Sequence, residues 1–340
     1  MVKCSICGRE AIYVSRGDGR AYCRRHFLRY FDRKVKKVIR RYGMFGKEER
    51  IVVAVSGGKD SLSLLHYLHN LAKKVPRWEV KALLIDEGIS GYRDVTIKDF
   101  RRVVNELGID GVVVSFKEVF GYSLDEIIRL GRERGLPYLP CTYCGVLRRY
   151  LLNKAARELG GTVLATAHNL DDVIQTFIMN VIRNSWDKVV RLGPVSGIQT
   201  HPKFVRRVKP FYEVLEKETT LYAILNDLYP REFVECPYAR TNIRWYVRKY
   251  LNKLEELNPG IKYSILNSLL TIINVLKEAG LGSEGEVSTC LVCGEPSANP
   301  VCRACLLRYE LGILEVPEGI RHYVDELVSK GRGRLGDLNN

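Results

Sequence analysis

A glycine-containing turn between an apolar stretch and a helical pattern is the strongest chemical signal in the sequence. The turn joins residues 51–55 to a run of leucines that begins at Leu62. Because two adjacent glycines lack a Cβ, the backbone can bring consecutive N–H groups close to an anion, and the helix dipole adds to the attraction. The spacing excludes the nucleotide P-loop and the dinucleotide fingerprint. We predict a polyphosphate site formed by Ser56, Gly57, Gly58, Lys59, Asp60 and Ser61.

Three cysteines form a second candidate site: Cys141, Cys144 and Cys236. The first two precede a helical pattern at 146–159, so we expect their sulfurs near a helix N-terminus, where thiolates are stabilised. Three thiolates cannot close a structural tetrahedral site, but they suit a 4Fe-4S cluster with one iron open to an exogenous ligand. A cysteine pair that carries a persulfide and a third zinc ion with a water ligand explain the same residues equally well.

The remaining cysteines fall into one set at each end of the chain. Both sets contain C-x-x-C pairs, and without a secretory leader such pairs favour metal binding over disulfides. Each module is too small to hold a core of its own, so a bound metal would supply its folding free energy. We predict one structural zinc ion per set, bound by Cys4, Cys7, Cys23 and His26 at one end and by Cys290, Cys293, Cys302 and Cys305 at the other.

Two adjacent carboxylates, Asp171 and Asp172, follow the apolar stretch that ends at Thr166. Carboxylates at this position can hold Mg²⁺ on ATP or position an attacking group. One of them can equally form part of a helix cap, since Asn169 is the expected N-cap residue. The pair is therefore a candidate site whose role depends on what lies beside it.

Strand-like and helical patterns alternate between the two ends of the chain. We expect strands at 51–55, 80–85, 112–116, 162–166 and 204–208. The clearest helical patterns lie at 95–107 and 170–182. This alternation predicts an α/β fold, a doubly wound parallel sheet flanked by N- and C-terminal zinc-finger modules. Ligands bind at the carboxyl ends of such strands, so residues 56–61, 86–88 and 166–169 should converge.

The rest of the chain gives weaker patterns. We expect an irregular segment at 184–200, a helical tail at 216–276 and a frayed basic end at 330–340. The predicted domains are an N-terminal zinc finger with a linker helix (1–45), a nucleotide-binding domain (46–235), a helical extension (236–285), a zinc ribbon (286–310) and a basic tail (311–340).

The overall charge indicates a polyanionic partner. The 340 residues carry a formal net charge of +15, and the pI is about 9.3. Such an imbalance suits nucleic acid. With no charged-then-apolar leader and no apolar run of membrane-spanning length, we expect a cytoplasmic protein that does not enter a membrane.

The order of these motifs resembles the TtuA-type tRNA 2-thiouridine synthetases, which carry the PP-loop of N-type ATP pyrophosphatases. The motifs are a zinc knuckle, S-G-G-K-D-S, P-C-x-x-C-G, A-H-N-x-D-D, E-C-P-Y-A and a terminal zinc ribbon. The resemblance covers nearly the whole chain. It implies a reaction in which ATP adenylates the C2 oxygen of a tRNA uridine and sulfide then displaces AMP.

The resemblance also implies roles for individual residues. Residues 56–61 would hold the pyrophosphate of ATP, which binds with Mg²⁺. Backbone contacts would come from Ala54 and Ile85, and further contacts from Ala167, His168 and Asp172. Asp172 would be the catalytic acid, assisted by Asp60 and Arg148. Cys141, Cys144 and Cys236 would ligate the 4Fe-4S cluster. Its open iron would accept sulfide, delivered by a thiocarboxylated ubiquitin-like carrier or supplied as free sulfide. The resemblance also implies that the enzyme is a homodimer.

Two residues depart from the family pattern: Arg148 stands where lysine is usual and Ala167 where glycine is usual. Arginine replaces a point charge with a planar fork, and the alanine methyl group narrows the approach of the nucleotide. Two alternatives to this function stay open. One is a different PP-loop enzyme, which uses a cysteine persulfide or ligates a group without sulfur, and the other is a non-catalytic RNA-binding zinc protein.

Overall fold

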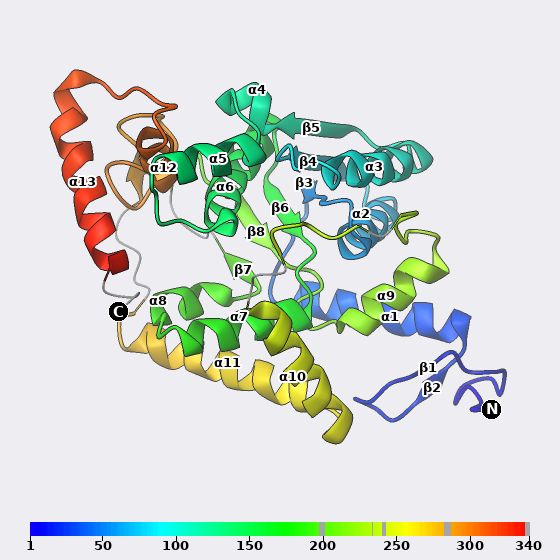
Figure 1. The fold of residues 1–340 in the computed structure, drawn as a ribbon. Coiled ribbons are helices and arrows are strands. Elements are labelled where there is room, and N and C mark those ends of the chain that lie inside the picture. The colour runs from blue at the N-terminus through cyan, green and yellow to red at the C-terminus, as the bar shows by residue number, and fades with distance from the viewer. Residues whose placement is uncertain (197–200, 233, 240–242, 282–286, 337–340) are drawn as a thin grey trace.

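A six-stranded sheet forms the centre of the molecule (Figure 1). The structure is a computed structural model that describes residues 1–196, 201–232, 234–239, 243–281 and 287–336. In pairing order the strands are β5 (Gly111–Ser115), β4 (Trp78–Asp86), β3 (Glu49–Ala54), β6 (Val163–Thr166), β8 (Arg206–Val208) and β7 (Val195–Ser196). Neighbouring strands are parallel except β7, which is antiparallel to β8. The predicted doubly wound sheet is therefore confirmed, with one antiparallel edge strand in addition.

Both faces of the sheet are buried, which explains why its strands are almost continuously apolar. Ile51 and Val53 of β3 belong to one hydrophobic cluster, whereas Val52 between them belongs to a second cluster on the opposite face. Alternate side chains of a strand point to opposite faces, so one short strand contributes to two cores. The parallel register brings the carboxyl ends of β3, β4 and β6 to one edge of the sheet.

Helices cover both faces. α2 (Lys59–Ala72) and α3 (Arg93–Leu107) pack on one face, and α6 (Pro140–Glu158) packs on the other. The shorter or peripheral helices in this part of the chain are α4 (Phe116–Phe120), α5 (Leu124–Glu133), α7 (Leu170–Ile182), α8 (Trp186–Val189) and the 3₁₀ turn η1 (Val190–Leu192). The strand β7 and these last two elements lie in the segment expected to be irregular, so that expectation was wrong for its described residues.

The expected continuous helical tail is instead divided into separate helices. α9 (Glu216–Leu225) begins where the tail was predicted to begin, and α10 (Arg244–Leu257) and α11 (Ile261–Glu278) follow. The described residues between α9 and α10, including Cys236, are not helical. This segment approaches the sheet edge, and it brings Cys236 to α6.

The two end modules are small and pack against the central domain. The N-terminal module has a hairpin of β1 (Tyr13–Val14) and β2 (Ala21–Tyr22), followed by α1 (Arg24–Arg41). It is tied to α9 by the fully buried Glu218, which accepts hydrogen bonds from Tyr13 at 2.8 Å and Tyr30 at 2.7 Å and pairs with Lys34 at 2.5 Å. The N-terminal module is therefore attached to a helix that reaches the candidate site.

The C-terminal module has a hairpin of β9 (Ser288–Thr289) and β10 (Pro296–Ser297), and its helix α12 (Arg303–Glu310) packs on α6. α13 (Glu318–Gly336) follows, so the expected frayed end is largely helical, and residues 337–340 of it lie outside the described residues. The expected basic tail at 311–340 was also wrong in its charge, because Asp and Glu outnumber Lys and Arg there. In the part of the chain that the structure describes, no helix is both long and apolar enough to cross a bilayer.

Candidate functional site

The glycine turn predicted to bind polyphosphate connects β3 to α2 at the carboxyl edge of the sheet. Gly57 has a φ of +84°, and a Cβ added there would lie 2.4 Å from the carbonyl oxygen of Thr96. Both the positive φ and the close approach of α3 therefore require glycine. The Ser61 hydroxyl accepts a hydrogen bond from the Ser56 N–H at 3.1 Å and donates to the Gly58 carbonyl at 2.9 Å, which fixes the shape of the turn. The first N–H groups of α2 have no partner inside the helix and can bind an anion.

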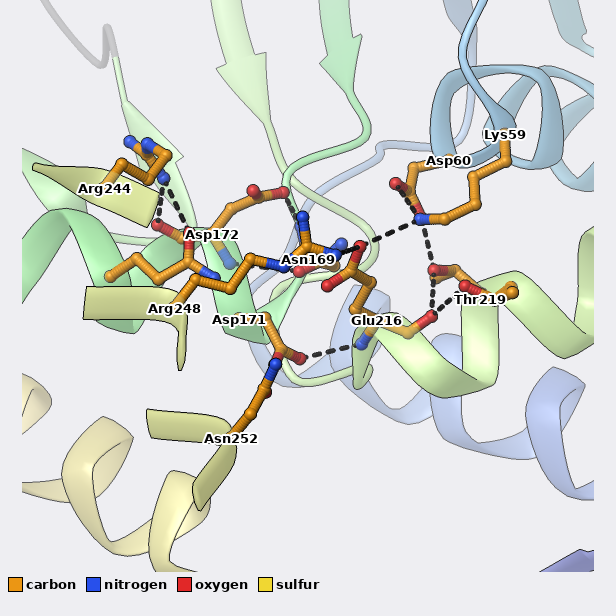
Figure 2. Close-up of polar contacts among 12 residues, drawn as sticks. Lys59, Asp60, Asn169, Asp171, Asp172, Glu216, Thr219, Arg244, Arg248 and Asn252 are labelled. Carbon is orange, nitrogen blue, oxygen red and sulfur yellow. Dashed lines mark hydrogen bonds and ion pairs between the residues drawn. The ribbon is translucent and has the colours of Figure 1, made fainter. Parts of the chain in front are cut away.

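Charged side chains surround the start of α2 (Figure 2). Lys59 Nζ lies 2.8 Å from an Asp60 carboxylate oxygen and 3.2 Å from Glu216 on α9. Burial alone would lower the pKa of Lys59, but these two carboxylates raise it. Thr219, also on α9, donates a hydrogen bond to Asp60. The ammonium group is therefore held beside the turn in its charged form, as a phosphate contact requires.

Asp172 lies at the start of α7, close to Asp60. Asn169 caps the helix as predicted: its side chain accepts a hydrogen bond from the Asp172 N–H at 3.0 Å, and the Asp172 carboxylate accepts one from the Asn169 N–H at 3.2 Å. Burial, with the negative charge of Asp60 nearby, raises the pKa of Asp172 to about 6, against the opposing charge of Arg244. Asp172 is thus a helix cap and also a carboxyl group that can hold a proton near neutral pH.

The neighbouring Asp171 has a structural environment. Its side chain is buried and pairs with the ammonium group of Lys262 on α11. It also accepts a hydrogen bond from the Glu216 N–H at 2.8 Å (Figure 2). Since both carboxylate oxygens already have partners, Asp171 joins α7, α9 and α11 and is not free to hold Mg²⁺. Of the two adjacent carboxylates, Asp172 is therefore the candidate for chemistry.

The three central cysteines come together beside α6. Cys141 and Cys144 lie within its first five residues. The charge of Cys141 raises the pKa of Cys236, and the charge of Cys236 raises the pKa of Cys144, so the three sulfurs are close to one another. Cys141 Sγ lies 3.9 Å from the carbonyl oxygen of Tyr238, in the segment that carries Cys236. Within the described residues, the three sulfurs are not among the groups whose ligand atoms all lie within 4.8 Å of one another. Their spacing is thus wider than that of a single-ion site.

The expected stabilisation of both thiolates at the helix N-terminus was wrong for Cys144. Burial raises the pKa of Cys144 to about 11 and outweighs the charge of Arg148, which lowers it, while the nearby Glu87 adds to the rise. Burial also raises the pKa of Cys236. Bare thiolates are therefore disfavoured here, whereas a cationic metal centre would replace the thiol protons.

A buried ion-pair network connects the cysteines to the glycine turn. Glu87, with no exposed surface, pairs with Arg93 and lies 3.3 Å from Arg148 and 4.0 Å from Cys144 Sγ. Arg93 in turn donates a hydrogen bond to the carbonyl oxygen of Ser56 at 2.7 Å. The residue range 86–88 was expected at this edge of the sheet, but nothing in its spacing identified Glu87 or its partner.

The two terminal sets match the geometry of zinc sites. In each set the four ligand atoms lie within 4.8 Å of one another. Two sulfurs bound tetrahedrally to one zinc ion at about 2.3 Å lie about 3.8 Å apart, and the Sγ atoms of Cys7 and Cys23 and those of Cys293 and Cys302 are each 3.7 Å apart. Although burial opposes it, hydrogen bonds from backbone N–H groups and His26 lower the pKa of Cys4 to about 5, as a metal-binding thiolate needs.

The other predicted contacts of the nucleotide lie at the same edge. Ala54 ends β3, Ile85 is near the end of β4, and Ala167 and His168 follow β6. Desolvation within the protein and the charges of Lys209 and Arg148 lower the pKa of His168 to about 3, so its ring is neutral. These four residues therefore lie at the same edge of the sheet as the glycine turn.

Comparisons with known proteins agree with this geometry. The PP-loop domain model matches residues 28–235. A tRNA-5-methyluridine(54) 2-sulfurtransferase of Pyrococcus horikoshii is 35% identical over 89% of this chain and 93% of its own. Cytoplasmic tRNA 2-thiolation protein 1 of Chlamydomonas reinhardtii is 36% identical over 93% of this chain and 84% of its own. The solved U34-tRNA thiolase NcsA from Methanococcus maripaludis, with its [4Fe-4S] cluster, shares 34% identity and a TM-score of 0.78 over 94% of this chain and 99% of its own.

The chain belongs to the tRNA-thiolation enzymes of the PP-loop family.

Several residues at the site of this family member escaped the sequence analysis. Glu87, Arg93 and Glu216 make their contacts across the fold, and their spacing in the chain carries no motif. The signal that could have found Glu87 is an acidic residue directly after the apolar strand β4, at the ligand-binding edge of a parallel sheet. For Glu216 no comparable signal exists, since it begins a helix far along the chain.

Proposed function

We propose that this protein is an ATP-dependent tRNA 2-thiolation enzyme that replaces the C2 oxygen of a uridine with sulfur. The observation that carries the proposal is the Arg93–Glu87 pair, which connects the carbonyl of Ser56 in the glycine turn to the surroundings of Cys144. A ligase without sulfur chemistry needs no cysteine site beside its ATP site. The relatives named for 2-thiolation support the same assignment.

In the proposed reaction, the glycine turn and Lys59 hold the β- and γ-phosphates of ATP, with Mg²⁺ on the phosphates near Asp60. The uridine C2 oxygen attacks the α-phosphorus, pyrophosphate leaves, and the oxygen becomes part of a good leaving group. Asp172, with a pKa of about 6, is placed to exchange a proton with the base. Arg148, whose charge acts on both His168 and Cys144, would contact developing negative charge.

Sulfide then attacks C2 and AMP leaves with the former uridine oxygen. Cys141, Cys144 and Cys236 would hold a 4Fe-4S cluster, which fits three thiols spaced more widely than a single-ion site allows. When bound, such a cluster supplies an open iron for exogenous sulfide. The raised pKa of Cys144 disfavours the alternative in which that residue carries a persulfide, since the nucleophile would have to be a thiolate.

The helix α10 supports RNA as the substrate. Trp245, Tyr246 and Tyr250 are 51%, 67% and 64% exposed, and Lys249 lies 3.6 Å from the centre of the Trp245 ring. Exposed aromatic rings beside cations are typical of surfaces on which unpaired bases stack. The two terminal sets would each hold a structural zinc ion. A cytoplasmic location, a thiocarboxylated carrier or free sulfide as donor, and a homodimer complete the proposal as predictions.

A thiolation assay tests the proposed function. Protein purified without oxygen is incubated with ATP, sulfide and in vitro transcribed tRNA, and 2-thiouridine is measured by mass spectrometry, with iron, zinc and acid-labile sulfide determined on the same sample. We expect about four iron and two zinc ions per chain and 2-thiouridine only when ATP is present. Zinc without iron after anaerobic reconstitution would contradict the cluster. Absence of 2-thiouridine from iron-loaded protein would contradict the proposed reaction.

A further inference from the structure

Three cations follow one another along α6 and β8, and we call Arg149, Arg207 and Lys209 the basic row. Arg207 donates a hydrogen bond from Nη2 to the backbone carbonyl of Arg149 at 3.2 Å. Lys209 donates from Nζ to the carbonyl of Gly193 at 2.7 Å. The guanidinium group of Arg149 lies over Gly145, where an added Cβ would be 3.4 Å from Nη1. The three side chains are therefore held near one another by backbone contacts.

Within the described part of the chain, the basic row has no carboxylate partner, unlike three other cations near the site. Arg93, Lys59 and Lys262 each pair with an acidic side chain. Among the residues that the structure describes, Arg149, Arg207 and Lys209 form no ion pair, and Nε of Arg207 is buried without a hydrogen-bond partner. Cations gathered without an acid are electrostatically unfavourable unless an anion joins them.

Repulsion between these cations lowers their pKa values. Desolvation and the charge of Arg149 lower the pKa of Arg207 to about 10. Desolvation and the charge of Arg207 lower the pKa of Lys209 to about 8. Desolvation and the charge of Arg148 lower the pKa of Arg149. Each member is thus destabilised by its neighbour, and one bound anion would relieve all three.

The position of the row separates it from the glycine turn. β8, which carries Arg207, is two strands away from β3 in the sheet, a distance of roughly 10 Å at the usual strand spacing. The preceding residue, Arg206, points to the other face, where it pairs with Glu49 at 3.1 Å. At its α6 end the row adjoins Arg148, whose partner Glu87 lies beside Cys144.

We propose that Arg149, Arg207 and Lys209 form a second phosphate-binding site, which holds a backbone phosphate of the substrate RNA beside the three-cysteine site. This inference rests on the proposed function. The phosphates of ATP share the same chemistry, but the glycine turn already accounts for them two strands away. An RNA whose uridine lies between the nucleotide and the cysteines would place a neighbouring phosphodiester where the row is.

The test measures the binding of in vitro transcribed, fluorescently labelled tRNA by fluorescence anisotropy at several KCl concentrations. Arg207→Gln is compared with Arg101→Gln, which removes an exposed charge on α3 away from the row. Arg149→Gln is a second variant at an exposed position, in case Arg207→Gln does not fold, and Arg207→Lys restores the charge. The affinity for a non-hydrolysable ATP analogue is measured without RNA by calorimetry.

We expect Arg207→Gln to weaken tRNA binding about 10-fold at low salt. We also expect the slope of log affinity against log salt to become shallower by about 0.7 to 0.9, the value for one lost phosphate contact. Arg101→Gln and Arg207→Lys should keep the wild-type slope, and ATP affinity should not change. A fall in ATP affinity with an unchanged slope would overturn the RNA assignment in favour of the nucleotide.

A slope that is the same in all variants would overturn the phosphate site itself. These results are distinct from failure of the proposed function, because binding is measured without turnover. A wild-type enzyme that thiolates tRNA while Arg207→Gln binds normally contradicts only the basic row. A protein that binds tRNA through the row but forms no 2-thiouridine contradicts only the proposed reaction.

Discussion

The terminal cysteine sets and the central three cysteines use the same side chain for opposite purposes. In each terminal set, four ligand atoms lie within 4.8 Å of one another. The central site has only three thiols, spread more widely, next to the buried ion pair of Glu87 and Arg93. A closed set of four donors leaves a metal no free position, whereas three donors leave one.

The difference teaches that the number of ligands and their surroundings carry more information than the C-x-x-C spacing, which all three groups share. The terminal sets stand in small modules that lack a core of their own. The central cysteines stand at the edge of a large sheet that would fold without them. We therefore expect metal loss to affect folding at the ends and chemistry at the centre.

The largest expected effect is the loss of a terminal metal. Cys305, a fully buried residue of α12, is a candidate ligand whose removal should abolish zinc binding at the C-terminal set. Structural zinc contributes on the order of 10 kcal/mol to modules of this kind, so Cys305→Ser should unfold the module. The measurement is zinc content together with limited proteolysis of residues 287–310. A module that stays protease-resistant without zinc would show that its contact with α6 suffices.

The next largest effect is expected at the centre. Cys236→Ser should reduce 2-thiouridine formation on the order of 10³-fold, as removal of a group at the reacting atoms commonly does. It should leave two zinc ions bound and change the melting temperature by no more than about 2 °C. Mass spectrometry of tRNA and thermal melting by circular dichroism measure the two quantities. If Cys236→Ser were instead unstable but retained its activity per folded molecule, the central cysteines would serve folding and not chemistry.

A smaller effect is expected from the buried ion pair of Glu87 and Arg93 beside the central site. Glu87→Gln leaves Arg93 buried without its partner charge, which costs about 3 kcal/mol of unfolding free energy. Glu48→Gln is the control, because Glu48 and its partner Arg77 are both about two-thirds exposed and such pairs contribute less than about 1 kcal/mol. Urea denaturation measures both variants.

A second measurement tests whether Glu87 acts on the thiol of Cys144, separately from its contribution to the stability of the fold. Because the charge of Glu87 raises the pKa of Cys144, its removal should speed alkylation of Cys144 at a given pH, as quantified by mass spectrometry of the labelled peptide. An unchanged alkylation rate would mean that Glu87 does not act on the thiol. Equal stability losses in the two glutamate variants would remove the distinction between buried and exposed pairs.

The smallest effect concerns pH and Asp172. The pKa of Asp172 is raised from 3.8 to about 6, so the folded state binds more protons than the unfolded state between these values. The raised pKa of Asp172 therefore lowers the free energy of unfolding as pH rises from about 4 to 6, and this loss is complete above pH 6.

Asp172→Asn removes this pH-dependent loss and still offers an oxygen to the Asn169 N–H. We expect the variant to be about 1 kcal/mol more stable than wild type at pH 7 and equal to it near pH 4. Urea denaturation at both values tests this, and a constant difference between them would refute the raised pKa.

The sequence predicted the parts of the structure that depend on near neighbours. The helix at 170–182 and its cap Asn169 were predicted at their observed positions, because helical periodicity and capping are local. The glycine turn and the terminal sets were identified for the same reason. β7 was missed, since two residues paired at a sheet edge leave no periodicity.

The site was predictable as a list of residues but not as an electrostatic environment. The proximity of Cys236 to α6 followed from the resemblance, yet the raised pKa of Cys144 depends on its burial and, to a smaller extent, on Glu87, which follows β4. The Asp171–Lys262 pair and the unpaired basic row likewise depend on which charges the fold places together. Such pairings are set by tertiary packing, which cannot be read from the spacing of residues in the sequence.

The helix α9 limits how this protein can be cut into pieces. Glu216 and Thr219 contact the residues of the glycine turn, while Glu218 between them is fully buried against Tyr13, Tyr30 and Lys34. A shortened chain starting at residue 28, where the family match begins, loses Tyr13 and exposes Tyr30 and Glu218 on the helix that also contacts the glycine turn. The smallest independently folding enzyme should therefore include the N-terminal module, which the melting temperatures of chains 28–340 and 1–340 would show.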